Sequence, residues 1–474
     1  MSRHSRLILL AAFAAGCATN PVTGRSELAL VSESQEIQMG KEYAEQVKAA
    51  YGLYDNNGVQ AYVSRLGMQL AAESERPGIP WQFHVIDDAA VNAFALPGGP
   101  VFITRGILTH MNSEAELASV LGHEIGHITA RHSVRQMSQA QLANLGLGIG
   151  SIFSSTVARA SGIASAGLSL LFLKYGRDAE KQSDELGFKY MVREGYDPRE
   201  MASMFETLQR ASGGGEGRLP EWLSTHPNPE NREVAVRQRI DSLNRDVSGM
   251  TVDREEFLRY IGGMTYGVNP REGFFRNGLF LHPDLRFQIQ FPNGWQTQNT
   301  KQAVAAMSPQ QDAILQMTLG QGSPDQAAQT FFGQQGIQSS NVTRNSVNGN
   351  PAVSGYFQAQ TEQGTLRGIA VFTQYGGNTY QFLGYTPAQA FGQYDGVFRQ
   401  AIGSFREVTD PAVLNVQPAR VELVRVPNDM TIEEFNRRYP SSVPVAQVAI
   451  INGVDAGGRL RAGMQAKRVV GGVE

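Results

Sequence analysis

The chain has 474 residues, of which 41% are hydrophobic and 18% are charged, and its formal net charge is -3 at pH 7. This length exceeds what one ordinary hydrophobic core supports, so we expect two or three globular domains and exclude a disordered chain. The small net charge and the lack of a run dense in Lys and Arg exclude a general attraction to nucleic acid, and we expect no nucleic-acid partner.

Residues 1–17 read MSRHSRLILLAAFAAGC, two arginines followed by a short apolar run and the only cysteine of the chain. This pattern predicts a secretory signal peptide that is too short to span a bilayer as a stable helix. The run ending at Cys17 resembles a bacterial lipoprotein signal, although Ala14 stands where that family usually has Leu. The resemblance implies lipidation of Cys17 and, with Ala18 next, a place on the periplasmic face of the outer membrane. A plain cleaved signal and an uncleaved anchor are the alternatives.

The next elements in chain order are helical and then β-rich. Residues 32–73 have the spaced apolar positions that are typical of helices. Residues 81–108 contain two β-rich runs on either side of Pro97–Pro100, which predicts a strand, a turn and a strand. Ser113 and Glu116 then stand at the spacing of a capping box, so we expect a helix to begin near residue 113.

The predicted helix carries the sequence VLGHEIGHITARH at residues 120–132. His123 and His127 are four residues apart, so their imidazoles share one helix face and can bind one zinc ion per chain. Glu124 projects beside such a metal and can take a proton from an attacking water. The alternative is a helix whose histidines only satisfy hydrogen bonds in a core, but it leaves the combination of residue types unexplained. The motif therefore predicts a catalytic zinc site.

A catalytic zinc needs a third protein ligand and an open position. A helix expected from about residue 177 to 194 carries Glu180 and Asp184 four residues apart, on one face. Glu185 is the nearest rival, but it lies five residues from Glu180 and points about 140° away. The alternative is that Glu180 and Asp184 lie on a solvent-exposed helix face and bind no metal.

The sequences HEIGHITARH, ExxxD on a later helix and THPNPENR together resemble the BepA-like and HtpX-like zinc metallopeptidases, relatives of the CaaX prenyl proteases. The resemblance covers about residues 17–245. It implies that Glu180 is the third zinc ligand and that Asp184 orients a ligand histidine. It also implies that His226 and Arg232 lie over the active site, where they stabilise an oxyanion. His226 instead takes the fourth zinc position if the resting state is closed. The alternative is that His226 is an ordinary loop histidine and Arg232 an arginine at the start of a helix, neither with a catalytic role.

Four further features carry weaker predictions. If residues 101–104 form the sheet edge beside the zinc, an extended substrate can add there as a strand; an ordinary internal strand is the alternative. His110 and His132 lie near the motif, and we expect packing or helix-end roles for them. Residues 142–173 are rich in Gly, Ala, Ser and Leu, and we expect buried or interfacial helices rather than membrane contact.

These observations predict an α+β fold with several domains. After the signal peptide with its lipidation cysteine at 1–17, a mainly helical metallopeptidase domain with a small β-sheet occupies 18–245. A linker is expected at 246–280, followed by an α+β, sandwich-like domain at 281–408 whose spacing resembles small photosystem-subunit-like domains. The last segment, 418–472, reads βααβ and resembles a LysM module, which implies peptidoglycan binding.

We therefore expect a membrane-anchored, periplasmic zinc metalloendopeptidase. The family resemblance implies unfolded or misfolded envelope proteins as substrates and a role in cell-envelope protein quality control. The alternative is a cell-envelope binding or scaffold lipoprotein with a vestigial protease domain. The presence of Glu124 argues against this alternative, because loss of that glutamate is the simplest route to an inactive relative.

Overall fold

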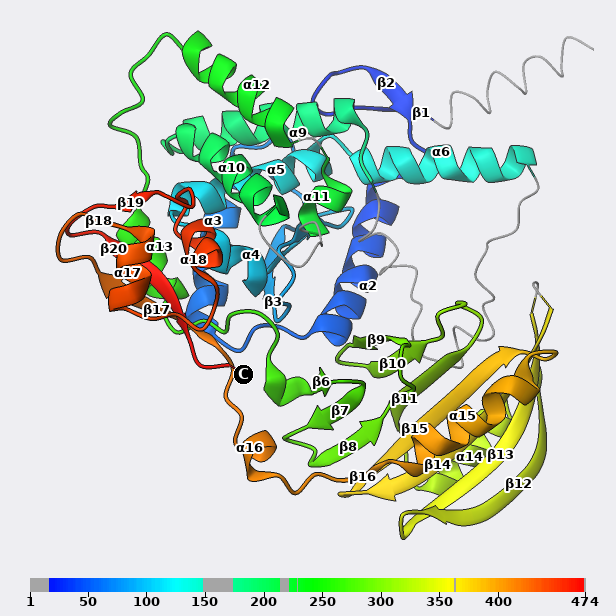
Figure 1. Cartoon of the computed structure of the whole chain (residues 1–474). Helices are drawn as coiled ribbons and strands as arrows, with labels where there is room; N and C mark the ends of the chain where they lie inside the picture. Colours follow the sequence, from blue (N-terminus) through cyan, green and yellow to red (C-terminus); the bar gives the residue numbers. More distant parts are fainter. Residues whose placement is uncertain (1–16, 148–173, 214–220, 228, 362–363, 473–474) are drawn as a thin grey trace, which may run out of the picture. The chain divides into compact units, whose positions relative to one another are not determined.

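The computed structural model describes residues 17–147, 174–213, 221–227, 229–361 and 364–472. They are divided between two compact units (Figure 1). Unit 1 contains the described residues of Met1–Ile149 and Ala166–Val268 together with Ala419–Gly471, and unit 2 contains Asn269–Pro418. Helices and sheets occur in both, which confirms the α+β class. The predicted signal lies outside the described residues apart from Cys17, as does the 142–173 segment beyond residue 147.

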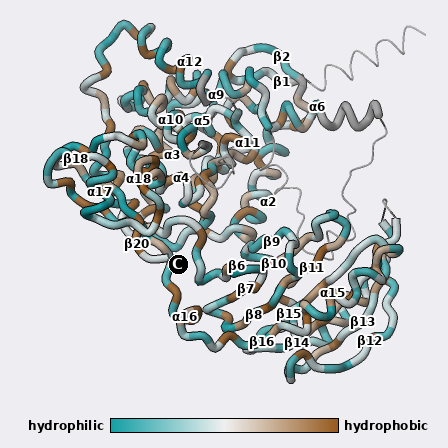
Figure 2. Tube along the Cα trace, viewed as in Figure 1, coloured by the Kyte–Doolittle hydropathy of each residue, from teal (hydrophilic) through white to brown (hydrophobic). Residues whose placement is uncertain are grey.

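Unit 1 is mainly helical. Its first helices are α2 (Glu33–Tyr51), α3 (Asn57–Ala72), α4 (Arg105–His110), α5 (Glu114–Thr129) and α6 (His132–Leu147). They are followed by α9 (Arg177–Arg193), α10 (Arg199–Gly213), α11 (Glu221–Thr225), α12 (Pro229–Ser242) and α13 (Arg254–Ile261). Figure 2 shows α12 as largely hydrophilic, in keeping with an outer position. Within the described part of the chain, we find no helix with the length and apolarity that crossing a bilayer requires.

Helix α5 is the central element of unit 1, and all of its residues are buried. It begins where expected, because the Ser113 side chain accepts a hydrogen bond from the Glu116 backbone N–H. Helix α9 packs against it so closely that a Cβ on Gly187 would lie 2.8 Å from the His123 nitrogen and one on Gly126 would lie 3.0 Å from Ser183 Cα. The glycines therefore allow the two helices to bring their polar side chains together.

A small sheet lies beside α5. Its strands are β3 (Gln82–Ile86), β4 (Ala93–Ala95) and β5 (Pro100–Thr104), in the spatial order β3-β5-β4. Strands β4 and β5 pair antiparallel, as the predicted hairpin requires, and Gly98 and Gly99 have φ of +77° and +129° in the turn. Strand β5 also pairs with β3 in parallel. Residues 101–104 therefore lie in the central strand of the sheet. The two edge strands are β3 and the short strand β4.

The segment predicted as a linker, 246–280, differs from that description. It contains α13, whose Phe257 and Leu258 are 0% exposed and belong to the hydrophobic core of unit 1. The amphipathic run REEFLRYI explains this, since its apolar residues recur at helical spacing and have a core to enter.

The C-terminal segment runs strand, helix, helix, strand and belongs to unit 1. Its elements are β17 (Arg420–Arg425), β18 (Met430–Thr431), α17 (Ile432–Arg438), α18 (Val445–Ile451), β19 (Arg459–Leu460) and β20 (Gln465–Val470). Strands β17 and β20 pair antiparallel. From β20, the buried Lys467 donates to the backbone oxygens of Thr109 (3.0 Å) and Met111 (2.5 Å), just before α5. The segment is thus fastened to the residues that lead into the central helix.

Unit 2 is built on a seven-stranded sheet in the order β12-β13-β14-β15-β11-β10-β9 and a four-stranded sheet in the order β16-β8-β7-β6. The strands are β6 (Phe274–Arg276), β7 (Leu279–His282), β8 (Phe287–Gln290), β9 (Gln296–Asn299), β10 (Ala303–Met307), β11 (Ile314–Gly320), β12 (Ile337–Val347), β13 (Asn350–Thr361), β14 (Gly364–Tyr375), β15 (Asn378–Pro387) and β16 (Arg406–Glu407). The helices are α14 (Pro324–Phe332), α15 (Phe391–Gly403) and α16 (Pro411–Leu414), with a 3-10 turn at Pro270–Glu272.

The large sheet of unit 2 has a hydrophobic core on each face. Ile369 and Val371 of β14 belong to the same cluster as Phe398 of α15. The alternate residues Ala370 and Phe372 belong to a second cluster with α14. Because successive side chains of a strand point to opposite faces, α14 and α15 cover opposite sides of the sheet.

Candidate metal centre

Two histidines from α5 form the base of the candidate site. His123 and His127 are each 1% exposed, and their Nε2 atoms lie 3.0 Å apart. The spacing of four residues places both rings on one face of α5, as the helical period demands. Burial of both rings excludes competing water. The Nε2 lone pairs of the two histidines face a common point inside unit 1.

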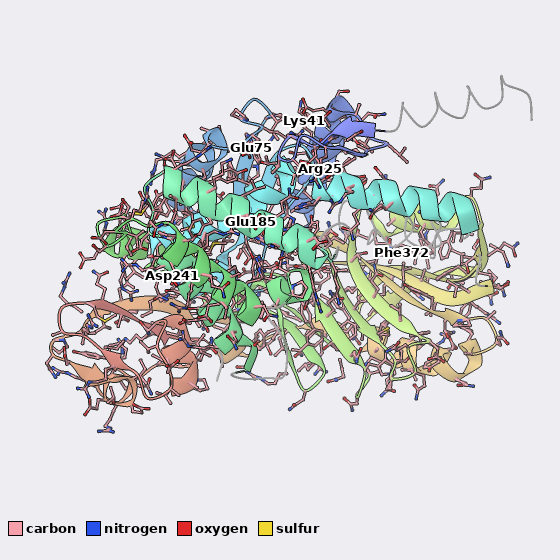
Figure 3. All side chains as sticks on the ribbon, turned by 90° about the horizontal axis from the view of Figure 1, so that it is seen from above. Arg25, Lys41, Glu75, Glu185, Asp241 and Phe372 are labelled. Carbon is pink, nitrogen blue, oxygen red and sulfur yellow. The ribbon has the colours of Figure 1, made fainter. Side chains whose placement is uncertain are left out.

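Helix α9 adds two carboxylates to this point. Glu180 Oε2 lies 3.6 Å from His123 Nε2, and Glu180 Oε1 lies 3.5 Å from His127 Nε2. Asp184, one turn later, accepts a hydrogen bond from His123 Nδ1 at 2.9 Å. Glu185 instead forms an ion pair with Arg239, and its side chain is 43% exposed; Figure 3 labels it on α9. The helical geometry thus separates Glu180 from its rival in the way the sequence predicts.

His226, directly after α11, completes the group. Its Nδ1 atom lies 2.9 Å from Glu180 Oε1 and 3.2 Å from His123 Nε2. Ligand atoms of His123, His127, Glu180 and His226 all lie within 4.8 Å of one another. In a tetrahedral zinc site with Zn–N distances of about 2.0–2.1 Å, neighbouring ligand atoms are about 3.3 Å apart. The separations of 2.9 Å, 3.2 Å and 3.5 Å fit such a site.

The tautomers of the two helix histidines are set by their outer hydrogen bonds. Asp184 accepts from His123 Nδ1, so the Nε2 atom of His123 keeps its lone pair. His132 Nε2 lies 2.9 Å from Gln182 Oε1, an acceptor, so His132 carries its proton there and its Nδ1 accepts. That Nδ1 is 2.9 Å from His127 Nδ1, which therefore donates. Both ligand histidines are left with a free lone pair at Nε2, the form that binds a metal.

The surroundings of His127 and Glu180 favour the protonation states of metal ligands. Burial lowers the pKa of His127 well below its usual value, so the ring is neutral. Burial opposes the charge of Glu180, but His226 and Arg232 outweigh it and hold the pKa of that carboxyl well below its usual range. For His226, burial is outweighed by the carboxylates of Glu180 and Glu124, which raise its pKa. An ionised carboxylate and a neutral imidazole are the ligand forms that zinc requires, and Glu180 and His127 have them; the raised pKa of His226 instead favours a protonated ring that donates to Glu180.

Glu124 lies beside this group and is 0% exposed. Its Oε1 atom accepts a long hydrogen bond from the Trp222 indole N–H at 3.4 Å and lies 3.6 Å from His226 Nε2. Its Oε2 atom has no hydrogen-bond partner among the described residues. A buried carboxylate oxygen without a donor is costly, and such atoms mark a place where a ligand or water completes the structure.

Arg232 lies within the site but faces the carboxylates. Its Nε and Nη2 atoms donate to the two oxygens of Asp184 at 2.8 and 2.7 Å. Its Nη1 atom lies 2.9 Å from Glu180 Oε2, close enough for an ion pair although the alignment of a hydrogen bond is lacking. The guanidinium is thus bound to Asp184, which orients His123, and paired with Glu180, a candidate ligand.

Sequence reasoning missed two aromatic residues that the structure places here, and it missed the role of one histidine. Trp222 contacts Glu124, and the ring of Tyr175 stacks on His127 at 3.9 Å while its hydroxyl bonds Ser133 at 2.8 Å. His132, for which packing was expected, hydrogen-bonds His127. The apolar tryptophan and the tyrosine carry no spacing signal, because their positions depend on where α11 and the segment before α9 pack.

Comparison with known proteins gives matches over the same region. Residues 57–240 match peptidase family M48. The chain is 32% identical over 240 residues to the beta-barrel assembly-enhancing protease of Escherichia coli (strain K12), which covers 49% of each chain. It is 33% identical over 168 residues to the mitochondrial metalloendopeptidase OMA1 of Arabidopsis thaliana, over 35% of this chain and 33% of the relative. The chain thus spans about half the length, or less, of these two curated relatives.

One solved structure is similar to a part of the chain. The cyanobacterial PsbP protein of Synechocystis sp. PCC 6803 is 15% identical, with 28% of this chain and 94% of that chain covered and a TM-score of 0.24. A TM-score this low supports no conclusion about fold or function.

Proposed function

Because residues 57–240 match peptidase family M48, we propose that this protein is a membrane-anchored, periplasm-facing zinc metalloendopeptidase. The relatives, one named as a protease and the other as a metalloendopeptidase, support the reaction class. The observation that carries the proposal is the convergence of lone pairs from His123, His127 and Glu180 beside the unpaired Oε2 atom of Glu124. This arrangement joins a metal site to a proton acceptor, as peptide hydrolysis requires.

His123, His127 and Glu180 would hold the zinc. When bound, zinc supplies Lewis acidity, which polarises a scissile carbonyl and lowers the pKa of water. Glu124 takes the proton of the attacking water and later delivers it to the leaving amine. Asp184 keeps the imidazole of His123 in its ligand tautomer through the bond of 2.9 Å.

Arg232 and His226 have different proposed roles. Arg232 keeps Glu180 and Asp184 ionised and in place, because its guanidinium is bound to Asp184 by two hydrogen bonds. We assign it to positioning rather than to the oxyanion. His226 is the fourth ligand in a closed, resting state, as its place 2.9 Å from Glu180 supports. Its removal is then expected to raise cleavage, whereas loss of an oxyanion donor would lower it by about 10²-fold.

The anchor and the substrates are proposed on separate grounds. Lipidation of Cys17 rests on the signal-like sequence before it. Cys17→Ser is expected to abolish lipid labelling and to release the protein from membranes. Unfolded or misfolded envelope proteins are proposed as substrates, in a quality-control role that the family resemblance of the sequence implies; the Escherichia coli relative is named as a protease that enhances beta-barrel assembly. The rival function, an envelope scaffold with a vestigial protease domain, does not require the ligand tautomers and the free Glu124 oxygen.

Metal content and cleavage of an unfolded protein test the proposal together. Wild type is expected to hold one zinc per chain and to cleave, and a chelator is expected to stop cleavage. Glu124→Gln keeps the zinc but lowers cleavage by about 10³-fold, within the range that general acid–base catalysis supplies. Glu185→Gln is the matched control on the exposed face of α9 and leaves both measurements unchanged. Cleavage by Glu124→Gln at the wild-type rate would refute the mechanism.

A further inference from the structure

The turn between α5 and α6 contains a residue in an unusual backbone conformation. Ala130 is the C-cap of α5, and the next residue, Arg131, has φ of +57°, in the left-handed region. Its backbone N–H donates to the oxygen of Ile128 at 3.0 Å, as in a helix end that closes through a left-handed residue. Glycine is the usual residue at such a position, because a Cβ there crowds the following carbonyl oxygen. An arginine in this conformation therefore points to a role for its side chain.

The left-handed turn determines where His132 lies. His132 follows Arg131 directly and is the first residue of α6. Its side chain is buried, and its Nδ1 atom lies 2.9 Å from Nδ1 of His127, a candidate metal ligand. In an uninterrupted helix, residues five positions apart point about 140° away from each other. The change of direction at Arg131 is therefore what brings the His132 ring behind the His127 ring.

The Arg131 side chain is held by the residues that precede and begin α2. Its Nε atom donates to Glu36 Oε2 at 2.9 Å, and its Nη2 atom donates to the backbone oxygen of Val31, also at 2.9 Å. The bond to Glu36 joins a guanidinium to a carboxylate, and such hydrogen bonds are among the strong ones in proteins. These two bonds stabilise the arginine in a backbone conformation that it would otherwise avoid.

Glu36 is a fixed acceptor rather than a mobile surface group. It is 0% exposed, and Arg76 donates to its Oε1 atom at 2.9 Å and to its Oε2 atom at 3.1 Å. The Gly98 N–H, in the turn between β4 and β5, donates to Oε1 at 3.2 Å. Arg76 also donates to the oxygen of Ile128, in the last turn of α5, at 2.9 Å. Glu36 thus joins α2 and the hairpin to the end of the helix that carries the metal ligands.

The strands before α2 contact the same turn. Strands β1 (Cys17–Thr19) and β2 (Ser26–Leu28) pair antiparallel, and Asn20 lies in the loop between them. The buried Asn20 side chain donates to the oxygen of Ala130 at 3.3 Å. Figure 1 shows β2 near the start of α6. Residues 20–36 therefore hold the turn between α5 and α6 through its backbone as well as through the Arg131 side chain.

We propose that Arg131 and Glu36 are positioning residues of the metal centre, in which their ion pair holds the left-handed turn that sets His132 against His127. Through His132, the pair fixes the orientation and the tautomer of His127, so residues 20–36 act as an outer layer of the metal centre. The inference rests on the proposed function, because it takes His127 to be a zinc ligand.

The first test measures zinc affinity in a double-mutant cycle, by competition with a chromophoric chelator. Arg131→Gly keeps the left-handed turn accessible but removes the guanidinium, and we expect zinc affinity to fall about 10-fold. In a chain that already has His132→Ala, the same substitution should change the affinity by less than about 2-fold, because Arg131 acts through His132. An equal loss in both backgrounds would indicate a general structural role and overturn the proposal, as would wild-type affinity of Arg131→Gly.

Two further variants serve as controls in the same assay. Arg135, also on α6, pairs with Glu27 of β2 at 3.8 Å rather than with Glu36, and Arg135→Gln should bind zinc like the wild type. Asn20→Ala removes the bond to Ala130 but keeps the pair of Arg131 and Glu36, so it should lower zinc affinity less than Arg131→Gly does. A larger loss in either control than in Arg131→Gly would overturn the assignment to the ion pair.

The second test needs no metal. In metal-free protein that is isotope-labelled at its histidines, ring-nitrogen NMR reports which nitrogen of His127 carries the proton. The wild type should show a proton on Nδ1 of His127, because Nδ1 of His132 accepts it there. Arg131→Gly should show a mixture of the two tautomers. Identical His127 signals in the two chains would overturn the proposal.

The two tests separate this inference from the proposed function. If the wild type binds no zinc and cleaves no protein, but the His127 tautomer changes with Arg131→Gly, the proposed function fails and the positioning of His132 by Arg131 stands. If the wild type binds zinc and cleaves an unfolded protein, but neither the zinc affinity nor the tautomer responds to Arg131→Gly, the proposed function stands and the inference fails.

Discussion

The two ends of helix α5 each bury titratable side chains, yet they do so in opposite ways. Near its start, Glu116 accepts from the Asn112 backbone N–H, and the Lys467 amino group donates to the oxygens of Thr109 and Met111. Donors there meet acceptors. In its second half, His123, His127 and Glu180 direct acceptor atoms at one another.

The difference shows how a structural cluster can be told from a functional one. A buried charge whose hydrogen bonds are satisfied within the protein adds to stability or fixes a packing arrangement. Buried acceptors that converge repel one another, and a cation relieves that repulsion. Titratable side chains are buried at both ends of α5, so the pairing of donors with acceptors is the property that distinguishes the two ends.

The largest effect on the protein is expected in the second half of α5, where the acceptor atoms of His123, His127 and Glu180 converge. Glu180→Ala removes the carboxylate that bridges the two histidines, and we expect the protein to lose its zinc on dialysis. Glu185→Ala, on the same helix but paired with Arg239, should retain one zinc per chain in the same measurement. If Glu185→Ala loses more metal than Glu180→Ala, the ligand assignment is wrong.

The next largest effect is expected near the start of α5, where buried donors meet acceptors. Lys467→Met leaves the buried oxygens of Thr109 and Met111 without their donor, which costs about 3 kcal/mol of unfolding free energy. Arg461→Met, an exposed position in the same segment, should change the unfolding free energy by less than about 0.5 kcal/mol. Urea unfolding of unit 1 measures both. Equal stability of the two variants would show that the C-terminal segment is not fastened by Lys467.

A smaller effect is expected from His132, which fixes the tautomer of His127. His132→Ala removes the acceptor for His127 Nδ1, so zinc affinity should fall by about 10- to 100-fold while the fold is kept. His84→Ala, a half-buried histidine whose ring bonds Gln82, serves as the control and should bind zinc like wild type. Competition with a chromophoric chelator measures the affinities; identical values would leave His132 with a packing role only.

The smallest effect concerns how stability depends on pH through His110, which lies shortly before the start of α5. Burial lowers the pKa of His110 from 6.5 to about 4, and its ring accepts from Gln447 and lies 2.8 Å from the Gly106 oxygen. Because the folded pKa is the lower one, this contribution to stability is present above pH 6.5 and is lost as pH falls toward 4. Between pH 6.5 and about 5, the wild type should lose about 1.5 kcal/mol more than His110→Gln does. Parallel urea titrations at the two pH values measure the losses, and equal losses would show that His110 binds its proton as readily in the folded protein as in the unfolded chain.

The sequence by itself determined the relations that lie within one helix. The helical period places His123 and His127 on one face, keeps Glu124 beside them and separates Glu180 from Glu185, and Ser113 caps the helix that carries the motif. These relations depend on a few neighbouring residues, so local geometry is sufficient to predict them. The match to peptidase family M48 then followed the same motifs.

Only the tertiary structure decided which distant groups meet. It placed Trp222 on Glu124, ordered His132 and Gln182 behind His127, and put strand β5 in the middle of its sheet rather than at the edge. It also brought Lys467 to Thr109, although 358 positions separate them in the chain. Such contacts depend on how complete helices and strands pack, and no local pattern encodes the partner because many surfaces of similar polarity would satisfy the same residue.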